Sequence, residues 1–288
     1  MNLTLLKGAP VASAIEQGAS DLARRLGSVG IRPTLAVVRL GEEKSAVSYE
    51  KGIEKRCVSC GVSIRRHILP KNASQPELEG VIRSLNADGE IHGILLMRPL
   101  PGSIDEDAVC RLISPEKDVD CASPLSLGAA LLGEEGAFSP CTAEAVVEML
   151  DFYLGRDYLE GKRAAIIGRS RVVGLPLSML LLRRNAAVTL CHSRSGDNAA
   201  VCRECDVVVS ACGRLESIGR DYFAPGQTVI DVGIGWSEKK QGLAGDVISE
   251  EAADIVSALS PVPGGVGAVT NAVLVSHTVS AAARLSKI

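Results

Sequence analysis

The chain alternates short apolar runs, which have the composition of β-strands, with longer stretches that have the periodicity of amphipathic helices. Three strand-like runs in the first half have this character: 34–40, 62–69 and 91–97. A helical pattern covers 44–59, and Ser74 is placed to cap another helix. Four further strand-like runs follow Lys162: RAAIIG, AAVTLCHS, DVVVSAC and QTVIDVGI. Apolar strands separated by helices pair in parallel and are buried on both faces. The pattern predicts two α/β units, with a loop-rich stretch over 114–140 and a boundary near Pro140.

Composition excludes several classes of function. The chain has 31 basic and 34 acidic residues, well mixed, and only 3% aromatic residues. Without a basic run or stacking side chains, nucleic acid is not expected as a partner. No apolar run reaches about 18–20 residues, so no membrane span is expected. The start MNLTLLKGAP lacks the features of a signal peptide. We therefore expect a cytoplasmic protein.

Nine cysteines are scattered along the chain, an odd number that favours reduced thiols over a disulfide framework. Two pairs have C-x-x-C spacing, Cys57/Cys60 and Cys202/Cys205. Zinc uses such spacing, but both pairs lie in helical patterns that lack a glycine or proline turn. Buried structural cysteines and no metal are the expectation.

The stretch AAIIGRSRVVGLP is typical of a nucleotide-binding turn. A strand is followed by Gly168, a short loop, Gly174, and a helix with a proline in its first turn. Such a turn presents backbone N–H groups and the positive end of a helix dipole to a phosphate. The glycines are six apart and do not form G-x-G-x-x-G, so a plain strand-to-helix turn is the alternative.

The end of the next strand indicates which cofactor is bound. An enzyme that uses NAD typically carries Asp or Glu there for the ribose 2′-hydroxyl. This chain has CHSRS, with Ser193 and Arg194, and Arg169 lies in the preceding loop. A hydroxyl and guanidinium groups suit a 2′-phosphate, which favours NADP. A solvated loop arginine is the alternative for Arg194. The two glycines of DVGIGW, at the end of a later strand, suit either a cofactor contact or a turn.

These motifs together resemble the methylenetetrahydrofolate dehydrogenase/cyclohydrolase (FolD) family. The resemblance is carried by RPLPGSIDEDAV, ISPEKDVD, PCTAEAVVEML, GRSRVVGLP, VTLCHSRS, VIDVGIG, GDV and PVPGGVGAVT, in this order along essentially the whole chain. It implies two α/β domains around a cleft, the second a Rossmann-like NADP-binding domain with a mostly parallel sheet. Residues 1–140, completed by 271–288, would bind folate, and 141–270 would bind NADP. The family forms homodimers and acts on tetrahydrofolate derivatives.

The implied reaction is oxidation of 5,10-methylenetetrahydrofolate to the 5,10-methenyl form with NADP. Most members then hydrolyse that product to 10-formyltetrahydrofolate.

The resemblance also implies roles for individual residues. Those expected to bind the cofactor are Gly168, Arg169, Ser170, Ser193, Arg194 and Ile234. Tyr49 would stack on the folate ring system and Asp120 would hydrogen-bond the pterin, whereas Asp118 is expected to be structural. Pro263, Gly264 and Gly265 would form a loop whose backbone approaches the folate.

Two family positions differ in this chain. The family has Y-x-x-x-K, but Ile53 stands four residues after Tyr49, and Met97 replaces the family glutamine. Lys51 and Lys55 lie about 160° and 120° around the helix from Tyr49. Hydride transfer mainly needs alignment, but hydrolysis needs proton transfer. The dehydrogenase is therefore expected, and the cyclohydrolase depends on a substitute base. Lys55 is the candidate, with Lys51 as the alternative if the helix bends at Gly52, and Arg98, beside Met97, is the candidate to replace the glutamine.

Two other functions stay open from the sequence. One is a non-catalytic folate- and NADP-binding subunit. The other is an amino-acid-type dehydrogenase, although no catalytic lysine–aspartate arrangement can be located for it.

Overall fold

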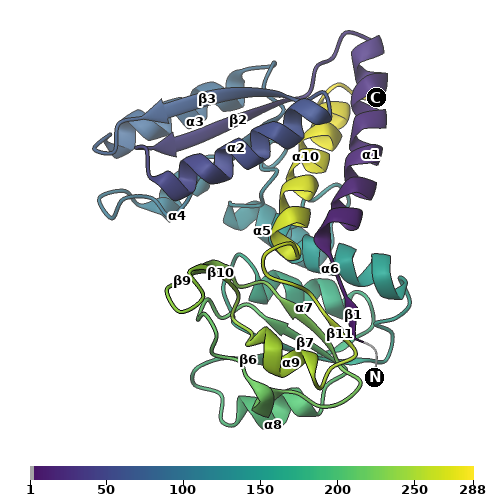
Figure 1. Cartoon of the computed structure of the whole chain (residues 1–288). Helices are drawn as coiled ribbons and strands as arrows, with labels where there is room; N and C mark the ends of the chain where they lie inside the picture. The colour runs from purple at the N-terminus through teal and green to yellow at the C-terminus, as the bar shows by residue number, and fades with distance from the viewer. Residues whose placement is uncertain (1–2) are drawn as a thin grey trace. The chain divides into compact units, whose positions relative to one another are not determined.

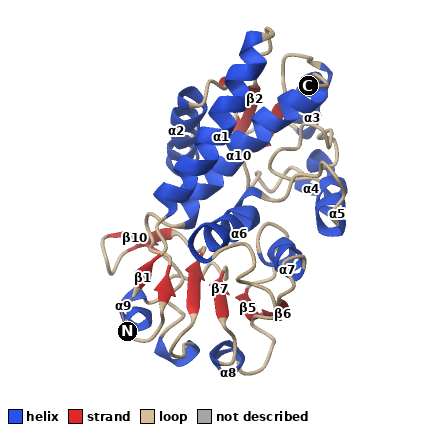
Figure 2. Cartoon of the chain, turned by 90° about the vertical axis from the view of Figure 1, so that its right-hand side faces the viewer, coloured by secondary structure: helices blue, strands red, loops and turns tan. Residues whose placement is uncertain are grey.

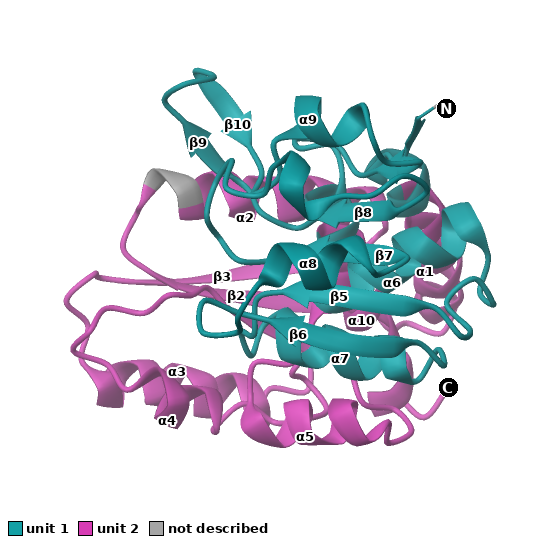
Figure 3. Cartoon of the chain, turned by 90° about the horizontal axis from the view of Figure 1, so that it is seen from below, with its two compact units in different colours: residues 1–12, 142–270 teal, residues 13–141, 271–288 magenta. Residues whose placement is uncertain are grey.

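The structure is a computed structural model that describes residues 3–288, apart from the side chains of Lys44 and Ser45. The chain forms two compact units (Figure 3). Unit 1 comprises residues 1–12 and 142–270, and unit 2 comprises residues 13–141 and 271–288. The expected division assigned residues 1–12 to the N-terminal folate-binding domain, which corresponds to unit 2. They group with unit 1 because β1 (Thr4–Leu5) pairs in parallel with β11 (Ala258–Leu259).

Unit 2 contains a three-stranded parallel sheet of order β3-β2-β4. Its elements in chain order are α1 (Gly8–Ser28), β2 (Thr34–Leu40), α2 (Lys44–Ser59), β3 (Ser63–Leu69), α3 (Gln75–Ala87), β4 (Gly93–Leu96), α4 (Glu106–Cys110) and α5 (Pro124–Leu132). The C-terminal part of α10 (Val266–Leu285) completes the unit. Within it, α1, α2 and α10 lie beside one another (Figures 1 and 2). The three strands predicted in this half are therefore confirmed, as is the helix over 44–59.

The core of unit 2 follows from the apolar periodicity of its strands and helices. Six of the seven residues of β2 are buried, which is what a central parallel strand requires. One buried cluster joins β2 and β4 to α3 and α4, with Val38, Ile94 and Ile82 among its members. The Glu77 carboxylate accepts a hydrogen bond from the backbone N–H of Ser74 at 2.7 Å, which fixes the start of α3 as expected.

Helix α5 lies within the stretch 114–140, which is otherwise rich in loops as expected, and this helix was not predicted. Ser123 caps the helix by accepting a hydrogen bond from the N–H of Ser126 at 3.1 Å, and Pro124 occupies its first turn. Gly133 ends it with φ of 74°. Nine residues are too few for a clear helical periodicity, and the capping residues were the available signal.

Unit 1 is built on a six-stranded parallel sheet of order β1-β11-β8-β7-β5-β6 (Figure 2). The other elements in chain order are α6 (Cys141–Leu154), β5 (Arg163–Ile167), α7 (Gly174–Leu182), β6 (Ala187–Cys191), α8 (Asn198–Arg203), β7 (Val207–Ser210), a 3-10 turn (Arg220–Tyr222), β8 (Thr228–Asp231), β9 (Gly235–Ser237), β10 (Gly242–Ala244) and α9 (Ser249–Ala253). Strands β9 and β10 form a separate antiparallel hairpin. From β5 the chain passes first to β6 and then back to β7 on the other side of β5. This switch point is where doubly wound sheets bind ligands.

Helix α10 is long and apolar enough to cross a membrane, with a mean hydropathy of 1.3. However, 72% of that window is buried inside the structure. Packing within the protein accounts for its composition.

Candidate functional site

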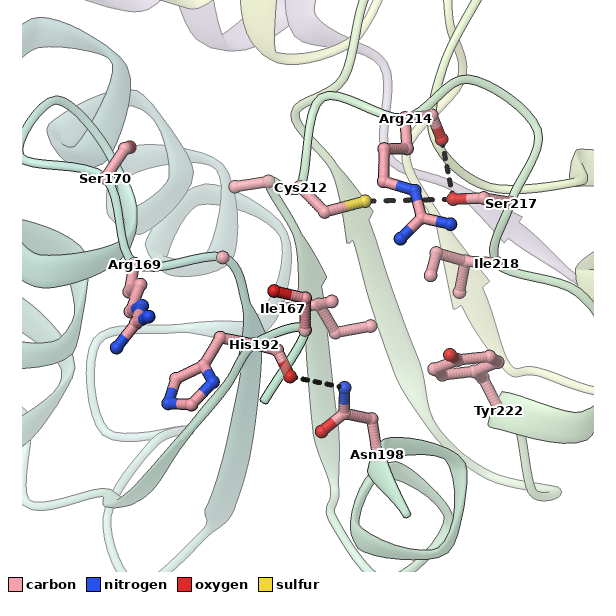
Figure 4. A pocket seen from close by; sticks show the side chains of 13 residues that line it. Ile167, Arg169, Ser170, His192, Asn198, Cys212, Arg214, Ser217, Ile218 and Tyr222 are labelled. Atoms are coloured by element: carbon pink, nitrogen blue, oxygen red, sulfur yellow. Dashed lines mark hydrogen bonds between the residues drawn. The ribbon is translucent and has the colours of Figure 1, made fainter. Parts of the chain in front are cut away.

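A cavity of about 330 Å³ lies in unit 1 where β5, β6 and β7 end (Figure 4). Gly168 follows β5, His192 follows β6 and Cys212 lies just beyond β7, and all three line the cavity. The carboxyl ends of the three strands therefore meet at one pocket, which has both polar and apolar lining residues. This is the expected place for a nucleotide in such a sheet.

Two glycines are required by the geometry of the turn after β5. Gly168 has φ of 127°, and a Cβ there would lie 2.2 Å from the carbonyl oxygen of Ala211. A Cβ on Gly174 would lie 2.1 Å from the carbonyl oxygen of Gly168. The loop therefore closes against the first turn of α7 in a way that no other residue type permits at either position. This close approach brings the loop backbone to the start of α7, and helix N-termini are places where phosphate groups commonly bind.

Four of the six residues expected to bind the cofactor line the cavity: Gly168, Arg169, Ser170 and Ser193. Arg169 is exposed and lies on the same side as His192, opposite Arg214 and Tyr222 (Figure 4). A guanidinium and a hydroxyl at the ends of adjacent strands form a donor set that fits a 2′-phosphate. No carboxylate lines the described cavity, so nothing there would repel that phosphate.

Arg194 and Ile234 do not line this cavity. The Arg194 side chain is exposed, and its backbone N–H donates to Nδ1 of His192 at 3.1 Å. The Ile234 side chain is 59% exposed, just beyond β8. Sequence reasoning missed Arg214 and Tyr222, which form the opposite wall, and Asn198, which lies beside His192 (Figure 4). Asn198 begins α8 and donates to the carbonyl oxygen of His192 at 3.0 Å, a position that capping by Asp197 could have indicated.

A pair of buried carboxylates organises the loops beside the cavity. Asp231 accepts hydrogen bonds from the N–H groups of Gly233 (2.9 Å), Asp246 (3.1 Å) and Val247 (2.9 Å). Asp246 in turn accepts from the N–H of Cys212 at 2.9 Å. Burial raises the pKa of Asp231 to about 6, against the opposing effect of these donors. A Cβ on Gly233 would lie 2.4 Å from the Asp246 carboxylate, so this glycine serves the loop packing.

A second cavity, of about 420 Å³, lies within unit 2. Its wall is formed by the residues after β2, by the first turns of α2 and by the loop after β4, and includes Tyr49, Met97 and Arg98. Arg39 also lines it, and its Nε donates to the Glu50 carboxylate at 2.7 Å, with both side chains at most 7% exposed. The cavity therefore has both apolar lining residues, such as Met97, and charged ones, such as Arg39 and Arg98.

Tyr49 and Asp120 belong to the same polar neighbourhood of unit 2. Desolvation raises the pKa of Tyr49, and the Asp120 carboxylate adds to the effect, although 42% of the tyrosine residue is exposed. The exposed part leaves a ring surface available for stacking. Asp120 Oδ2 lies 3.6 Å from Nη2 of Arg98. By contrast, Asp118 is fully buried and accepts from the N–H groups of Ala122 and Ser123, both at 2.8 Å.

Ile53, at the position where the resemblance implies a lysine, is fully buried one turn after Tyr49. Helix α2 is continuous from Lys44 to Ser59, and it leaves Lys51 and Lys55 exposed. Neither lysine lines the cavity. Met97 does line it but offers no proton donor.

The loop over residues 263–265 lies in unit 1 at the start of α10. Gly264 has φ of 98°, and a Cβ on Gly265 would lie 2.5 Å from the carbonyl oxygen of Pro261. Both positions therefore require glycine, and Pro263 precedes them. Nothing in these contacts occupies the outward face of the turn at Gly264, where a Cβ would meet open space.

All nine cysteines are free thiols, and eight of them are buried. Burial raises the pKa of Cys57 to about 12. Among residues 3–288, no group of three or more His, Cys, Asp or Glu side chains is placed to hold a metal ion.

Comparison with known proteins identifies the family. Residues 6–120 match the model for the tetrahydrofolate dehydrogenase/cyclohydrolase catalytic domain, and residues 140–286 match that for its NAD(P)-binding domain. The chain is 43% identical over 277 residues to the bifunctional protein FolD of Carboxydothermus hydrogenoformans, with 96% of each chain covered. It matches the crystal structure of bifunctional FolD from Campylobacter jejuni with a TM-score of 0.94 and 37% identity, over 98% of this chain and 99% of that one.

The Trypanosoma brucei methylenetetrahydrofolate dehydrogenase-cyclohydrolase, whose crystal structure is a complex with NADP and an inhibitor, matches with a TM-score of 0.92 and 33% identity, covering 100% of both chains. The two family models together span nearly the whole sequence, and the relatives match over nearly their full length. The chain therefore belongs to the tetrahydrofolate dehydrogenase/cyclohydrolase family.

Proposed function

We propose that the chain is an NADP-dependent 5,10-methylenetetrahydrofolate dehydrogenase of one-carbon metabolism. The observation that carries this proposal is the cavity at the switch point of the unit 1 sheet. There, Gly168 lets the loop after β5 pack closely against its neighbours, and Arg169 and Ser193 supply hydrogen-bond donors for a phosphate. Family membership supplies the tetrahydrofolate substrate.

The cofactor, when bound, accepts a hydride from the methylene carbon of the substrate. The residues of unit 1 bind and orient it. The loop from Gly168 to Ser170 would hold its phosphates, and Arg169 and Ser193 would hold the 2′-phosphate by charge-assisted hydrogen bonds. Arg194 is exposed at the same strand end, within the same loop as Ser193. Ile234 would contact the cofactor through its backbone, since its side chain is largely exposed.

The substrate would be held by Tyr49 and Asp120. The exposed ring surface of Tyr49 supports stacking on the pterin. The Asp120 carboxylate would accept the paired N–H donors of the aminopyrimidine edge. Pro263, Gly264 and Gly265 would let the backbone approach the folate, which agrees with the open space beside Gly264. No strong base is needed for hydride transfer, because the substrate passes its hydride directly once aligned.

The second reaction of the family finds no lysine among the described residues that line the cavity of unit 2. Hydrolysis of the methenyl product requires proton transfers, and the described lining residues include neither lysine nor glutamine. Lys55, the candidate substitute, is exposed on α2 and does not line that cavity. We therefore expect cyclohydrolase activity well below the dehydrogenase activity.

A direct assay tests both reactions. Purified protein given methylenetetrahydrofolate and NADP should produce NADPH and the methenyl product in equal amounts. Saturable binding without turnover, with NADP or with NAD, would instead indicate a non-catalytic binding subunit, an alternative that the comparisons do not favour. Methenyltetrahydrofolate supplied alone then separates enzymatic hydrolysis from the spontaneous background. If hydrolysis exceeds the background, Lys55→Ala and Lys51→Ala show whether either lysine acts as the base.

A homodimer in the cytoplasm completes the proposal. Free thiols at all nine cysteines suit a reducing compartment. Trp236 and Leu243 are cross-strand neighbours on the β9–β10 hairpin and are 58% and 45% exposed. Such an apolar pair is suited to an interface. Light scattering on the eluting peak of a size-exclusion column would measure the mass, and a monomeric mass at micromolar concentration would exclude the dimer.

A further inference from the structure

Arg98 is the cation of the unit 2 cavity that is not fixed by short hydrogen bonds. It lies in the loop after β4 and lines the cavity with Tyr49. Its Nη2 is 3.6 Å from Oδ2 of Asp120, and its Nη1 is 3.9 Å from Oε1 of Glu106. Both distances are ion-pair contacts, longer than a hydrogen bond. Arg39, the other arginine of the cavity, is bound directly to Glu50 at 2.7 Å and to the carbonyl oxygen of Gly41.

The Arg98–Asp120 pair is half-buried, so each charge has a stronger effect on the ionisation of its partner than it would in water. The two side chains are only 21% and 27% exposed. A carboxylate in such a place loses much of its hydration, and an opposite charge nearby compensates for part of the loss. Desolvation is the largest influence on Asp120 and raises its pKa, while Arg98 is the strongest influence that lowers it.

Other charged or titratable groups face Asp120 from every element around it. Asp118 raises its pKa, and Cys141 at the start of α6 and His277 on α10 lower it less than Arg98 does. Tyr49 on α2 is also within electrostatic reach. Of these groups, Arg98 is the one that stands in the cavity with a permanent charge.

We propose that Arg98 is a positioning residue, which holds the Asp120 carboxylate ready to accept the paired N–H donors of the pterin. The inference rests on the proposed function, because it takes a tetrahydrofolate as the ligand. The ion pair engages Oδ2 of Asp120 at 3.6 Å, which is longer than a hydrogen bond, and 27% of the Asp120 side chain is exposed. Arg98 therefore determines how tightly the substrate binds, and over which pH range, without touching the reacting carbon.

The test compares binding of 5-formyltetrahydrofolate between pH 5 and 9 by calorimetry. The proteins are wild type, Arg98→Leu, Arg98→Lys and the matched control Glu106→Gln. Because Arg98 favours the ionised carboxylate, its removal should move the acid-side loss of binding to higher pH. For each pH unit of that shift, the dissociation constant below the midpoint should rise about tenfold. Arg98→Lys should restore most of the wild-type profile, and Glu106→Gln should not move the loss of binding upward.

Kinetics of the full dehydrogenase reaction provide a second readout. Arg98→Leu should raise KM for methylenetetrahydrofolate with the same pH dependence, while KM for NADP stays unchanged. An unaltered binding profile in Arg98→Leu would overturn the inference. Uniform weakening at all pH values, without rescue by lysine, would also overturn it, since that result means a purely structural role. If wild type neither binds the probe nor turns over, the proposed function itself fails; if wild type does both, only the role of Arg98 is at stake.

Discussion

Ile53→Lys introduces the lysine that the family resemblance implies, at a position that is shielded from water in this protein. Ile53 is fully buried in α2. A buried lysine amine loses its hydration, and its pKa can fall to about 5–6, against about 10.4 in the unfolded chain. The unfolded state then binds one more proton than the folded state across this range, so the free energy of unfolding rises with pH.

The size of the effect follows from the pKa difference. At pH 7 the amine is neutral in the folded protein. This pH lies about 3.4 units below the pKa of the amine in the unfolded chain. The destabilisation is therefore about 4.6 kcal/mol, at about 1.36 kcal/mol for each unit. Between pH 7 and 9 the variant should recover about 2.7 kcal/mol. The matched control Ile53→Met keeps the volume, should cost less than about 1.5 kcal/mol and should show no such pH dependence.

Urea unfolding at pH 7, 8 and 9 measures this dependence, and hydrolysis of methenyltetrahydrofolate measures its functional counterpart. The same shift that destabilises the variant leaves a neutral amine able to take a proton, so hydrolysis should rise above wild type. A variant whose stability relative to Ile53→Met is constant from pH 7 to 9 would refute the reasoning, because the amine would then be hydrated. If the free energy of unfolding rises with pH but hydrolysis does not increase, the amine is buried as argued but does not act as the base for hydrolysis.

Three further substitutions test the two cavities. Gly168→Ala forces a Cβ to within 2.2 Å of a carbonyl oxygen at φ of 127°, so we expect strain of about 1–3 kcal/mol, seen as a lower Tm, and weaker NADP binding in a titration. Arg169→Leu should lower the ratio of kcat/KM for NADP to that for NAD by at least about tenfold, since a charge-assisted hydrogen bond contributes about 1.5–3 kcal/mol, whereas Arg171→Leu, outside the cavity, should leave the ratio in place. Arg39→Met removes one of the two partners of the buried Glu50 carboxylate, which keeps its 2.6 Å contact with Arg66, and urea unfolding should show a loss of about 1–3 kcal/mol.

The sequence predicted most of the strands and long helices because their apolar residues recur with a clear period. It contained no prediction for α1, although 21 residues are enough to show a helical period, and it missed α5, where nine residues are too few. It also missed β1, whose two residues form a strand only through pairing with β11. A two-residue strand has no periodicity of its own, and its partner lies far away along the chain. Such elements are defined by tertiary contacts, which local patterns do not contain.

The nucleotide cavity was predictable where its residues lie in the turn after a strand, as Gly168 and Arg169 do. Arg214 and Tyr222 come from a long loop beyond β7, and only the fold shows that they reach the same cavity. Arg98 was visible as a neighbour of Met97, but its 3.6 Å contact with Asp120 joins residues 22 positions apart and needed coordinates.

The pairing of β1 with β11 has a consequence for how the chain acquires its fold during synthesis. Thr4 aligns with Ala258, so the ribosome makes one edge of the unit 1 sheet about 250 residues before the neighbour it pairs with, and the closing loop is correspondingly long. Unit 2 is interrupted in the same way, since its residues 271–288 are translated last. Neither unit is complete as a nascent segment. A premature stop before residue 258 would thus remove β11 from unit 1 and α10 from unit 2 at once.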